Sequence, residues 1–331
     1  MDKPGESGLE TFLLDSAERS RRNWRLVPTA LAALAAACLL LGWYWGRPPA
    51  APDAGALVRA AGERGQVPGA ASTLTLQAIV RTLLEKPGGY LANDRLPPGV
   101  LMDDMPSFEL GALVHVRDMS RALRRDFSRA VLQSVEDPDL LRAEPSFNFR
   151  HDSWLVPSSE GEYRAGVDSL DRYFQRLTDP DAPGAYFFAR ADNLARWLED
   201  VGQRLDGYVQ RLGAAVEQRT APPAGPGAAG NTPWSQIDNE FFEARGYCWA
   251  LRAQLAAVQV DFSATLAERG AAESLAAIIR ELEGTQRPIR SPLILNGSEY
   301  GMLANHSLVM AGYVARAHAG VLVLRSQLER G

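Results

Sequence analysis

The chain has 331 residues, of which 46% are hydrophobic and 23% are charged, and its formal net charge is −5. This mildly acidic balance leaves no extended basic surface and argues against a nucleic-acid partner. The length is sufficient for one large domain or two modest domains with a hydrophobic core.

Residues 1–25 form a charged tail, which we expect in the cytoplasm. A tail of this length is far smaller than a folded domain. It therefore cannot hold a kinase, a cyclase or another output domain, and a receptor that signals inward is disfavoured.

Residues 26–46 are the clearest element of the sequence, with about 20 consecutive residues free of charge. As a helix they would span about 30 Å, the thickness of the hydrocarbon core of a bilayer. Arginines precede the stretch and aromatic residues mark both of its ends: Arg21, Arg22, Trp24, Arg25, Trp43, Tyr44 and Trp45. Positive charge favours the cytoplasmic side. We therefore predict a single-pass anchor in the lipid bilayer, with a cytoplasmic N-terminus and everything after residue 46 on the other side of the membrane.

Three other interpretations of this stretch are less consistent with the residues. A cleaved signal peptide has a shorter basic start and an apolar region of about 7–15 residues. A lipoprotein modified at Cys38 would begin with the apolar sequence LLLGWYW, which favours the bilayer interior. A buried helix of a soluble protein does not explain the arginines and the two aromatic belts.

The rest of the chain divides into a linker at 47–71 and an all-α domain at 72–331. The linker is rich in Pro, Gly and Ala, as flexible spacers are. In the domain, apolar residues recur at helical spacing between capping and breaking signals. The pattern predicts a helix that starts at the N-cap candidate Ser72 and stops at Lys86-Pro87, and a second that Ser107 and Glu109 open. It also predicts a short helix that starts at Asp137-Pro138 and ends at Glu144-Pro145, and one over 159–177.

Residues 192–269 carry the most regular apolar pattern and predict a long antiparallel, coiled-coil-like helical hairpin. Apolar residues step by three and four in both arms, the spacing that two helices wound around each other require. Between the arms, 220–233 is a flexible, proline-broken linker long enough for the chain to reverse.

Two more helices are expected at about 271–283 and 305–328. The last one is rich in small apolar residues, but Arg316 and His318 interrupt it. Charged residues inside membrane spans are rare. We therefore expect this helix in the core of the domain rather than in the membrane.

Residues that could carry chemistry are few, and we predict no catalytic group, metal site or cofactor. The four histidines lack metal-ligand spacing, and Cys38 and Cys248 lie too far apart for a zinc site or a disulfide. His115 fits a core position. The remaining candidates for ligand or partner binding lie in loops or at helix starts: Asp103, Glu109, Arg150, His151, Asp152, Trp154 and His306. The alternative for the aromatic segment 147–154 is that it covers an edge of the core.

Several segments resemble a bacterial family of unknown function, number twenty-three thirty-three in the series of such domains. They are KPGGYLANDRLPPG (86–99), DMSRALRRDFSRA (118–130), EDPDL (136–140), AEPSFNF (143–149) and SEYGMLANHSLVMAGYVARA (298–317). The resemblance implies an inner-membrane anchor followed by a mainly helical periplasmic domain. It implies no activity.

These observations favour a non-enzymatic envelope protein that acts as a scaffold or an assembly factor and contacts another envelope protein. Association of several copies of this chain is also consistent with a helical domain. The alternative is an envelope hydrolase or ligand-binding protein with a cleft around Asp103, Glu109, His151 and Asp152. The discriminating observation is whether these four groups converge in one concave site.

Overall fold

The computed structural model describes residues 27–129, 136–181, 184–220, 234–287 and 306–330. Within these ranges the structure contains helices and loops and no strand, which confirms the all-α prediction. The α-helices that follow the N-terminal one are α2 (Ala54–Ala61), α3 (Ala70–Glu85), α4 (Asp104–Ala122), α5 (Leu140–Asn148), α6 (Ser159–Leu177), α7 (Ala191–Thr220), α8 (Trp234–Asp261), α9 (Ser263–Glu268), α10 (Ala272–Thr285) and α11 (His306–Glu329).

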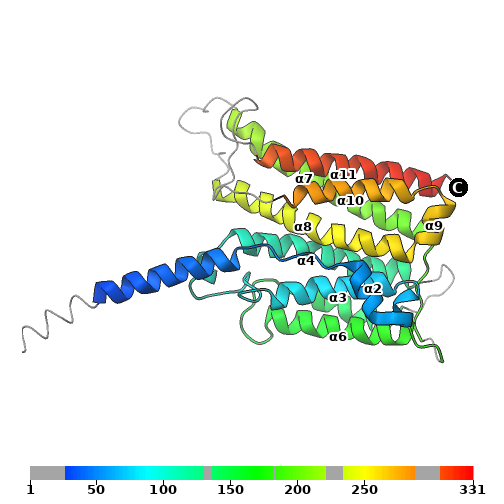
Figure 1. Ribbon diagram of the computed structural model, residues 1–331, viewed down its shortest axis with the longest axis horizontal. Coiled ribbons are helices and arrows are strands. Elements are labelled where there is room, and N and C mark those ends of the chain that lie inside the picture. The colour runs from blue at the N-terminus through cyan, green and yellow to red at the C-terminus, as the bar shows by residue number, and fades with distance from the viewer. Residues whose placement is uncertain (1–26, 130–135, 182–183, 221–233, 288–305, 331) are drawn as a thin grey trace, which may run out of the picture.

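The N-terminal helix, Val27–Trp45, projects from one end of the body as a single rod (Figure 1). Two helices among the described residues are long and apolar enough to cross a membrane, and this is one of them. None of its most apolar window is buried, whereas 39% of the corresponding window of α11 is buried. Val314, Val321 and Leu324 of α11 are in the core, so this helix packs within the body as the sequence predicts.

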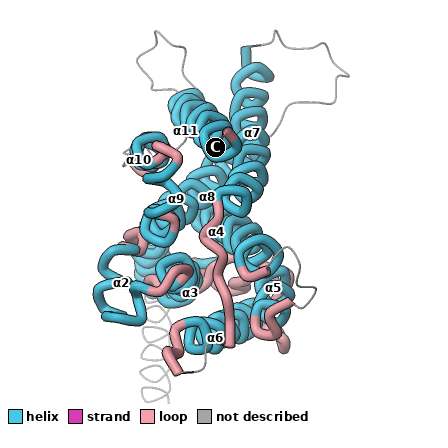
Figure 2. The backbone as a smooth tube through the Cα atoms, turned by 90° about the vertical axis from the view of Figure 1, so that its right-hand side faces the viewer, coloured by secondary structure: helices cyan, strands magenta, loops and turns pink. Residues whose placement is uncertain are grey.

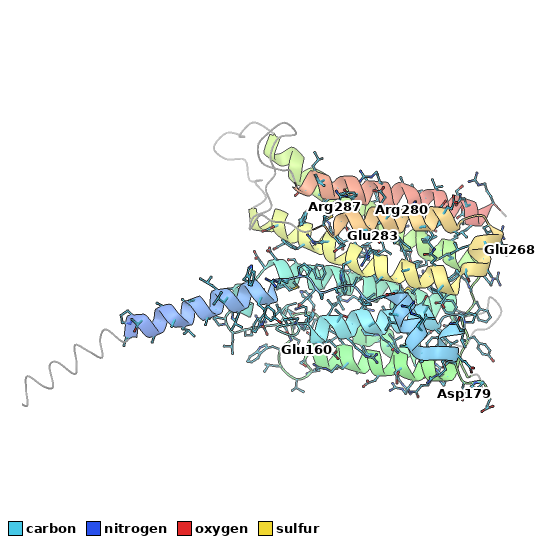
Figure 3. All side chains as sticks on the ribbon, viewed as in Figure 1. Glu160, Asp179, Glu268, Arg280, Glu283 and Arg287 are labelled. Atoms are coloured by element: carbon cyan, nitrogen blue, oxygen red, sulfur yellow. The ribbon has the colours of Figure 1, made fainter. Side chains whose placement is uncertain are left out.

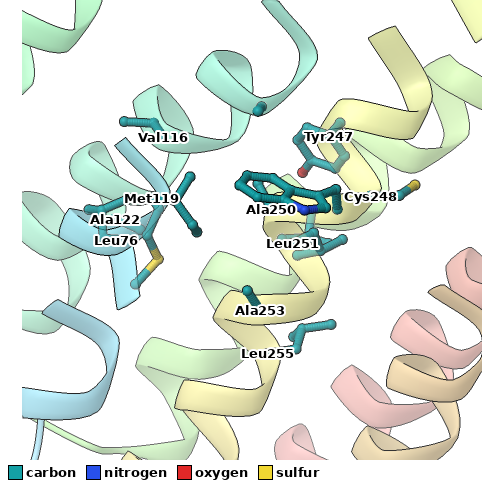
Figure 4. Close-up of a cluster of buried hydrophobic side chains, with 14 of the residues drawn as sticks. Leu76, Val116, Met119, Ala122, Tyr247, Cys248, Ala250, Leu251, Ala253 and Leu255 are labelled. Atoms are coloured by element: carbon teal, nitrogen blue, oxygen red, sulfur yellow. The ribbon is translucent and has the colours of Figure 1, made fainter. Parts of the chain in front are cut away.

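The body has three layers, which Figure 2 shows nearly end-on. Helices α7, α10 and α11 form one outer layer, and α2, α3, α5 and α6 form the other. Between them lie α4 and α8, of which α8 contacts helices of both outer layers. One hydrophobic cluster has members in all three layers. Figure 4 shows the part of it that α3, α4 and α8 form.

Helices α4 and α8 cross at two glycines. A Cβ atom at Gly111 of α4 would overlap the backbone carbonyl of Glu243, and one at Gly246 of α8 would overlap that of Phe108. Only residues without a side chain allow backbones to approach this closely. Around the crossing, His115 is buried against Tyr247, with ring centroids 5.6 Å apart, which confirms it as a core residue.

The predicted coiled-coil hairpin over 192–269 is not confirmed. Its two arms exist as α7 and α8 and run antiparallel (Figure 1). However, α7 packs mainly along α11, and α8 packs mainly along α4. The contact between the arms is short: Tyr208 contacts Glu243 and Tyr247, and Arg211 pairs with Glu243 at 3.1 Å. Residues 221–233 of the predicted linker lie outside the described residues.

Three local expectations also differ from the structure. The segment 47–71 contains α2, whose start is capped by the Asp53 carboxylate and whose Val58 side chain is buried, so this part of the predicted spacer packs on the body. Helix α5 continues through Pro145 to Asn148 instead of ending before the proline. Helix α4 starts at Asp104, three residues earlier than expected, which places Glu109 in the second turn.

Candidate functional site

A cavity of about 920 Å³ lies where the N-terminal helix meets the body. Its wall combines the end of that helix, the start of α4 and one face of α8. The side chains that line it include aromatic rings, arginines and carboxylates: Trp43, Arg47, Met102, Asp103, Asp104, Phe242, Arg245, Trp249, Arg252 and Gln286. We call this space the junction cavity. Its mixed wall suits a ligand with both charged and apolar parts.

Arg245 is the least expected group in the junction cavity, because it is a cation with only 6% of its surface exposed. Its Nη2 atom donates to the carbonyl oxygens of Gln286 and Arg287, each at 3.1 Å. Among the described residues its Nε atom has no acceptor and no carboxylate forms an ion pair with it. Burial therefore lowers its pKa to about 10. A buried, unpaired charge is costly, and an anionic group bound in the cavity would compensate it.

Two carboxyl groups, Asp103 and Asp104, also line the junction cavity, and Asp238 of α8 is a neighbour of Asp104. The Asp103 carboxylate caps α4 by accepting from the backbone N–H of Asp104 at 3.1 Å. Asp104 is hydrogen-bonded to Asp238, and burial together with repulsion from neighbouring carboxylates raises the pKa of Asp104 to about 7 and that of Asp238 to about 6. Near neutral pH the Asp104–Asp238 pair therefore retains part of a proton.

Glu109 does not face the junction cavity. Its carboxylate is fully buried and lies 2.7 Å from Nζ of Lys86. It also accepts from the backbone N–H groups of Leu91, at 3.0 Å, and Ala92, at 2.8 Å. Burial raises the pKa of Glu109 to about 7, and the lysine and the two N–H groups oppose this rise. The residue ties the loop after α3 to α4, so its contacts are structural.

Arg150, His151, Asp152 and Trp154 lie in the loop between α5 and α6. The Arg150 guanidinium forms a bidentate pair with Asp152, at 2.8 and 2.9 Å, which lowers the pKa of Asp152 to about 2. His151 is half-buried, and burial lowers its pKa. Trp154 is 58% exposed. The prediction that the segment 147–154 covers an edge of the core is correct for Phe147, which is fully buried, but not for Trp154.

This loop is bound to the loop that follows α3. The Asn93 side chain donates to the Ser153 carbonyl at 2.8 Å and to Glu160 at 2.7 Å, and Arg95 donates to the Asp152 carbonyl at 3.3 Å. We call residues 93–101 and 149–158 the paired end loops. Figure 3 labels Glu160 at the end of the body from which the N-terminal helix leaves, and Asp179 at the opposite end.

The predicted site residues therefore lie in three environments: Asp103 in the junction cavity, Glu109 in a buried ion pair, and 150–154 in the paired end loops. His306 is the first residue of α11, and its side chain is outside the described part of the structure, as are Arg21, Arg22, Trp24 and Arg25. Trp43 and Tyr44 are exposed, whereas Trp45 packs against Gly88. Among the described residues no group of three His, Cys, Asp or Glu side chains could hold a metal ion.

Several buried charged residues were not predicted, among them Arg245, Lys86 and Asp261. Arg245 directly follows Ala244 and borders the apolar face of the predicted hairpin arm, and a charge so close to this face is a signal. A second signal is Lys86 itself, because Lys3 and Lys86 are the only lysines in a chain that otherwise uses arginine. Asp261, the last residue of α8, accepts from the backbone N–H groups of Gly69, Ala71 and Ser72 at 2.9, 3.3 and 2.7 Å. No sequence pattern indicates this contact.

Comparison with known proteins agrees with the resemblance noted in the sequence. Residues 18–331 match the family described as uncharacterized protein conserved in bacteria (DUF2333). No curated protein and no solved structure matches the chain. Because the match covers both the N-terminal helix and the whole helical body, the chain belongs to this family of uncharacterized bacterial proteins.

Proposed function

We propose that this protein is a single-pass inner-membrane protein whose helical body stands in the periplasm as a non-enzymatic scaffold or assembly factor. The observation that carries the proposal is the N-terminal helix, which is apolar and unburied. Its 19 residues would span about 28 Å, close to the thickness of the hydrocarbon core. Leu31, Leu34 and Leu39 are each more than half exposed, and a bilayer would cover them.

The topology is tested by cysteine labelling in spheroplasts. In a Cys38→Ser background, the variant Tyr186→Cys places a thiol on an exposed position of the body, while Cys248 is fully buried. A membrane-impermeant maleimide should label Tyr186→Cys in intact spheroplasts and should label Ser7→Cys only after lysis. The reverse pattern would overturn the proposed orientation.

The scaffold role is tested in cross-linked cell envelopes. Purification of the full chain should recover discrete protein partners in defined ratio. Recovery of the chain alone, as a monomer, would count against a scaffold and against association of several copies.

A second candidate function is ligand binding in the junction cavity, which the buried and unpaired Arg245 favours. The groups of the hydrolase interpretation, Glu109, His151 and Asp152, are not among the residues that line this cavity. The test is the thermal midpoint of the full chain in detergent with and without inorganic phosphate. Phosphate should raise the midpoint of the wild type and not that of Arg245→Gln, and an equal response of both would exclude the site.

A further inference from the structure

The exposed apolar side chains of the body gather in the paired end loops. Outside the N-terminal helix, thirteen large apolar side chains of the described residues are exposed, and six of them lie in these two short loops. Single exposed apolar residues are common on soluble proteins, but a concentrated group indicates a contact surface. The six are Leu96 (77% exposed), Val100 (48%), Leu101 (76%), Trp154 (58%), Leu155 (63%) and Val156 (100%).

The two loops form one surface rather than two independent ones. Asn93 and Arg95 of the first loop donate to the backbone carbonyls of Ser153 and Asp152 in the second. From the other side, Arg117 of α4 donates to the carbonyls of Phe147 and Phe149, each at 2.8 Å, and fixes where the second loop leaves α5. The backbone that carries the exposed apolar side chains is therefore held in place by these hydrogen bonds.

This surface lies beside the last turn of the N-terminal helix. A Cβ atom at Gly42 would be 3.7 Å from Cβ of Pro98, and one at Gly46 would be 3.6 Å from the Met102 side chain. Gly42 lies three residues before Trp45, so the turn at Pro97–Pro98 is at the level of the end of the proposed span, about 4–5 Å from its last residue along the helix axis. Trp43 and Tyr44, 66% and 49% exposed, are at the same level.

Arginines accompany the apolar residues at this end of the body. Arg95 is exposed in the first loop, and the Arg47 guanidinium lies 3.8 Å above the ring of Trp43. Arg150 is exposed in the second loop and is paired with Asp152. Arginine and tryptophan side chains together suit the headgroup region, where the cation meets phosphate and the ring lies among the first methylene groups. A protein partner at this position would have to displace lipid that surrounds the anchor.

We infer that the paired end loops insert Leu96, Leu101 and Val156 into the periplasmic headgroup region of the bilayer, beside the point where the anchor leaves it. This inference rests on the proposed function, because it requires the N-terminal helix to span the membrane. The axes of α3, α4 and α6 lie roughly parallel to that of the anchor (Figure 1). The body therefore stands on these loops with its long helices directed away from the membrane.

The test is depth-dependent quenching in nanodiscs that contain the full chain. In the Cys38→Ser background, Val156→Cys and Leu101→Cys each carry an environment-sensitive fluorophore, and the lipid mixture includes a phospholipid with a nitroxide near the headgroup. Two further labelled positions serve as the negative and the positive control. Tyr186→Cys labels an exposed apolar position between α6 and α7, at the opposite end of the body, and Leu34→Cys labels the middle of the anchor with a deep nitroxide as quencher.

The expected result is at least twofold quenching at both Val156→Cys and Leu101→Cys with the shallow nitroxide, a blue-shifted emission, and neither effect at Tyr186→Cys. If neither loop label is quenched while the Leu34→Cys label is, the inference is wrong and the proposed membrane span is retained. If Leu34→Cys is not quenched either, the membrane span and the inference fail together.

Discussion

The two ends of α3 are each held by a buried carboxylate, but in different ways. At the N-terminal end, Asp261 accepts from three backbone N–H groups and has no ion-pair partner among the described residues. At the C-terminal end, Glu109 accepts from two backbone N–H groups and pairs with Lys86. The helix dipole explains the difference, because its positive end stabilises Asp261 and its negative end requires a cation beside Glu109.

Whether a buried carboxylate requires a counter-ion therefore depends on which end of the helix it faces. In both places burial raises the pKa, to about 6 for Asp261 and to about 7 for Glu109. Four substitutions or conditions test this view.

The largest effect is expected for Lys86→Met. The substitution leaves Glu109 buried without a cation, and loss of one partner of a buried ion pair costs about 3–5 kcal/mol. Urea unfolding of the full chain in detergent, followed by circular dichroism, measures the change. In the double variant Lys86→Met with Glu109→Gln no charge remains, so part of the lost stability should return. A double variant as unstable as the single one would contradict the ion-pair explanation.

The next largest effect is the pH dependence of the free energy of unfolding that Asp261 causes. Its folded pKa of about 6 lies above the ordinary value of 3.8, so the folded state binds the proton more tightly than the unfolded state. Stability from this group is therefore present below pH 3.8 and is lost as the pH rises through 6. From pH 4 to pH 7.5 the wild type should lose about 2–3 kcal/mol relative to Asp261→Asn, which cannot titrate there. A constant difference between the two proteins would refute the assignment.

A smaller effect is expected for Asp261→Ala at neutral pH. The change leaves the N–H groups of Gly69, Ala71 and Ser72 without their acceptor and should cost about 1–2 kcal/mol. Asp53→Ala is the matched control, because Asp53 caps α2 at an exposed position with one N–H, from Ala56 at 3.1 Å. Equal losses in thermal unfolding would show that burial of the cap is unimportant.

The smallest effect is expected for Asp152→Asn. Its pair with Arg150 is as short as the buried one, but both groups are exposed to water. Exposed pairs contribute little because solvent screens them. The unfolding midpoint should not change measurably, and a clear decrease would mean that pair length rather than burial determines the effect.

Much of the fold follows from the sequence because helix periodicity and breakers are local. The pattern of Val167, Leu170, Tyr173 and Phe174 gives α6 over the range in which the structure has it. The apolar run 26–46 likewise gives a helix at Val27–Trp45. The apolar face of α8 is also predicted correctly, but the pattern of apolar residues does not indicate which helix packs against that face. Gly111 and Gly246, 135 positions apart, make α4 the partner instead of α7.

The candidate site was less predictable, because burial depends on contacts between distant segments. The sequence predicts Glu109 in the first turn of a helix that Ser107 opens, but α4 starts at Asp104, and the Glu109 side chain pairs with Lys86. Positive φ angles at Gly88 and Gly89 reverse the chain and bring the two residues together. Arg245 could be recognised as a charge that borders an apolar face, but the cavity that it lines includes the end of the N-terminal helix, about 200 residues earlier.

The joint between the N-terminal helix and the body has a mechanical consequence. A free linker of 25 residues would let a domain drift about 25–30 Å from its attachment point. Here Trp249 donates from Nε1 to the Pro49 carbonyl at 3.0 Å, and Trp45 lies against Gly88, so little slack remains. Tilting or rotating the N-terminal helix would therefore turn the whole helical body with it, and a partner bound to the body would stay at a fixed distance from that helix.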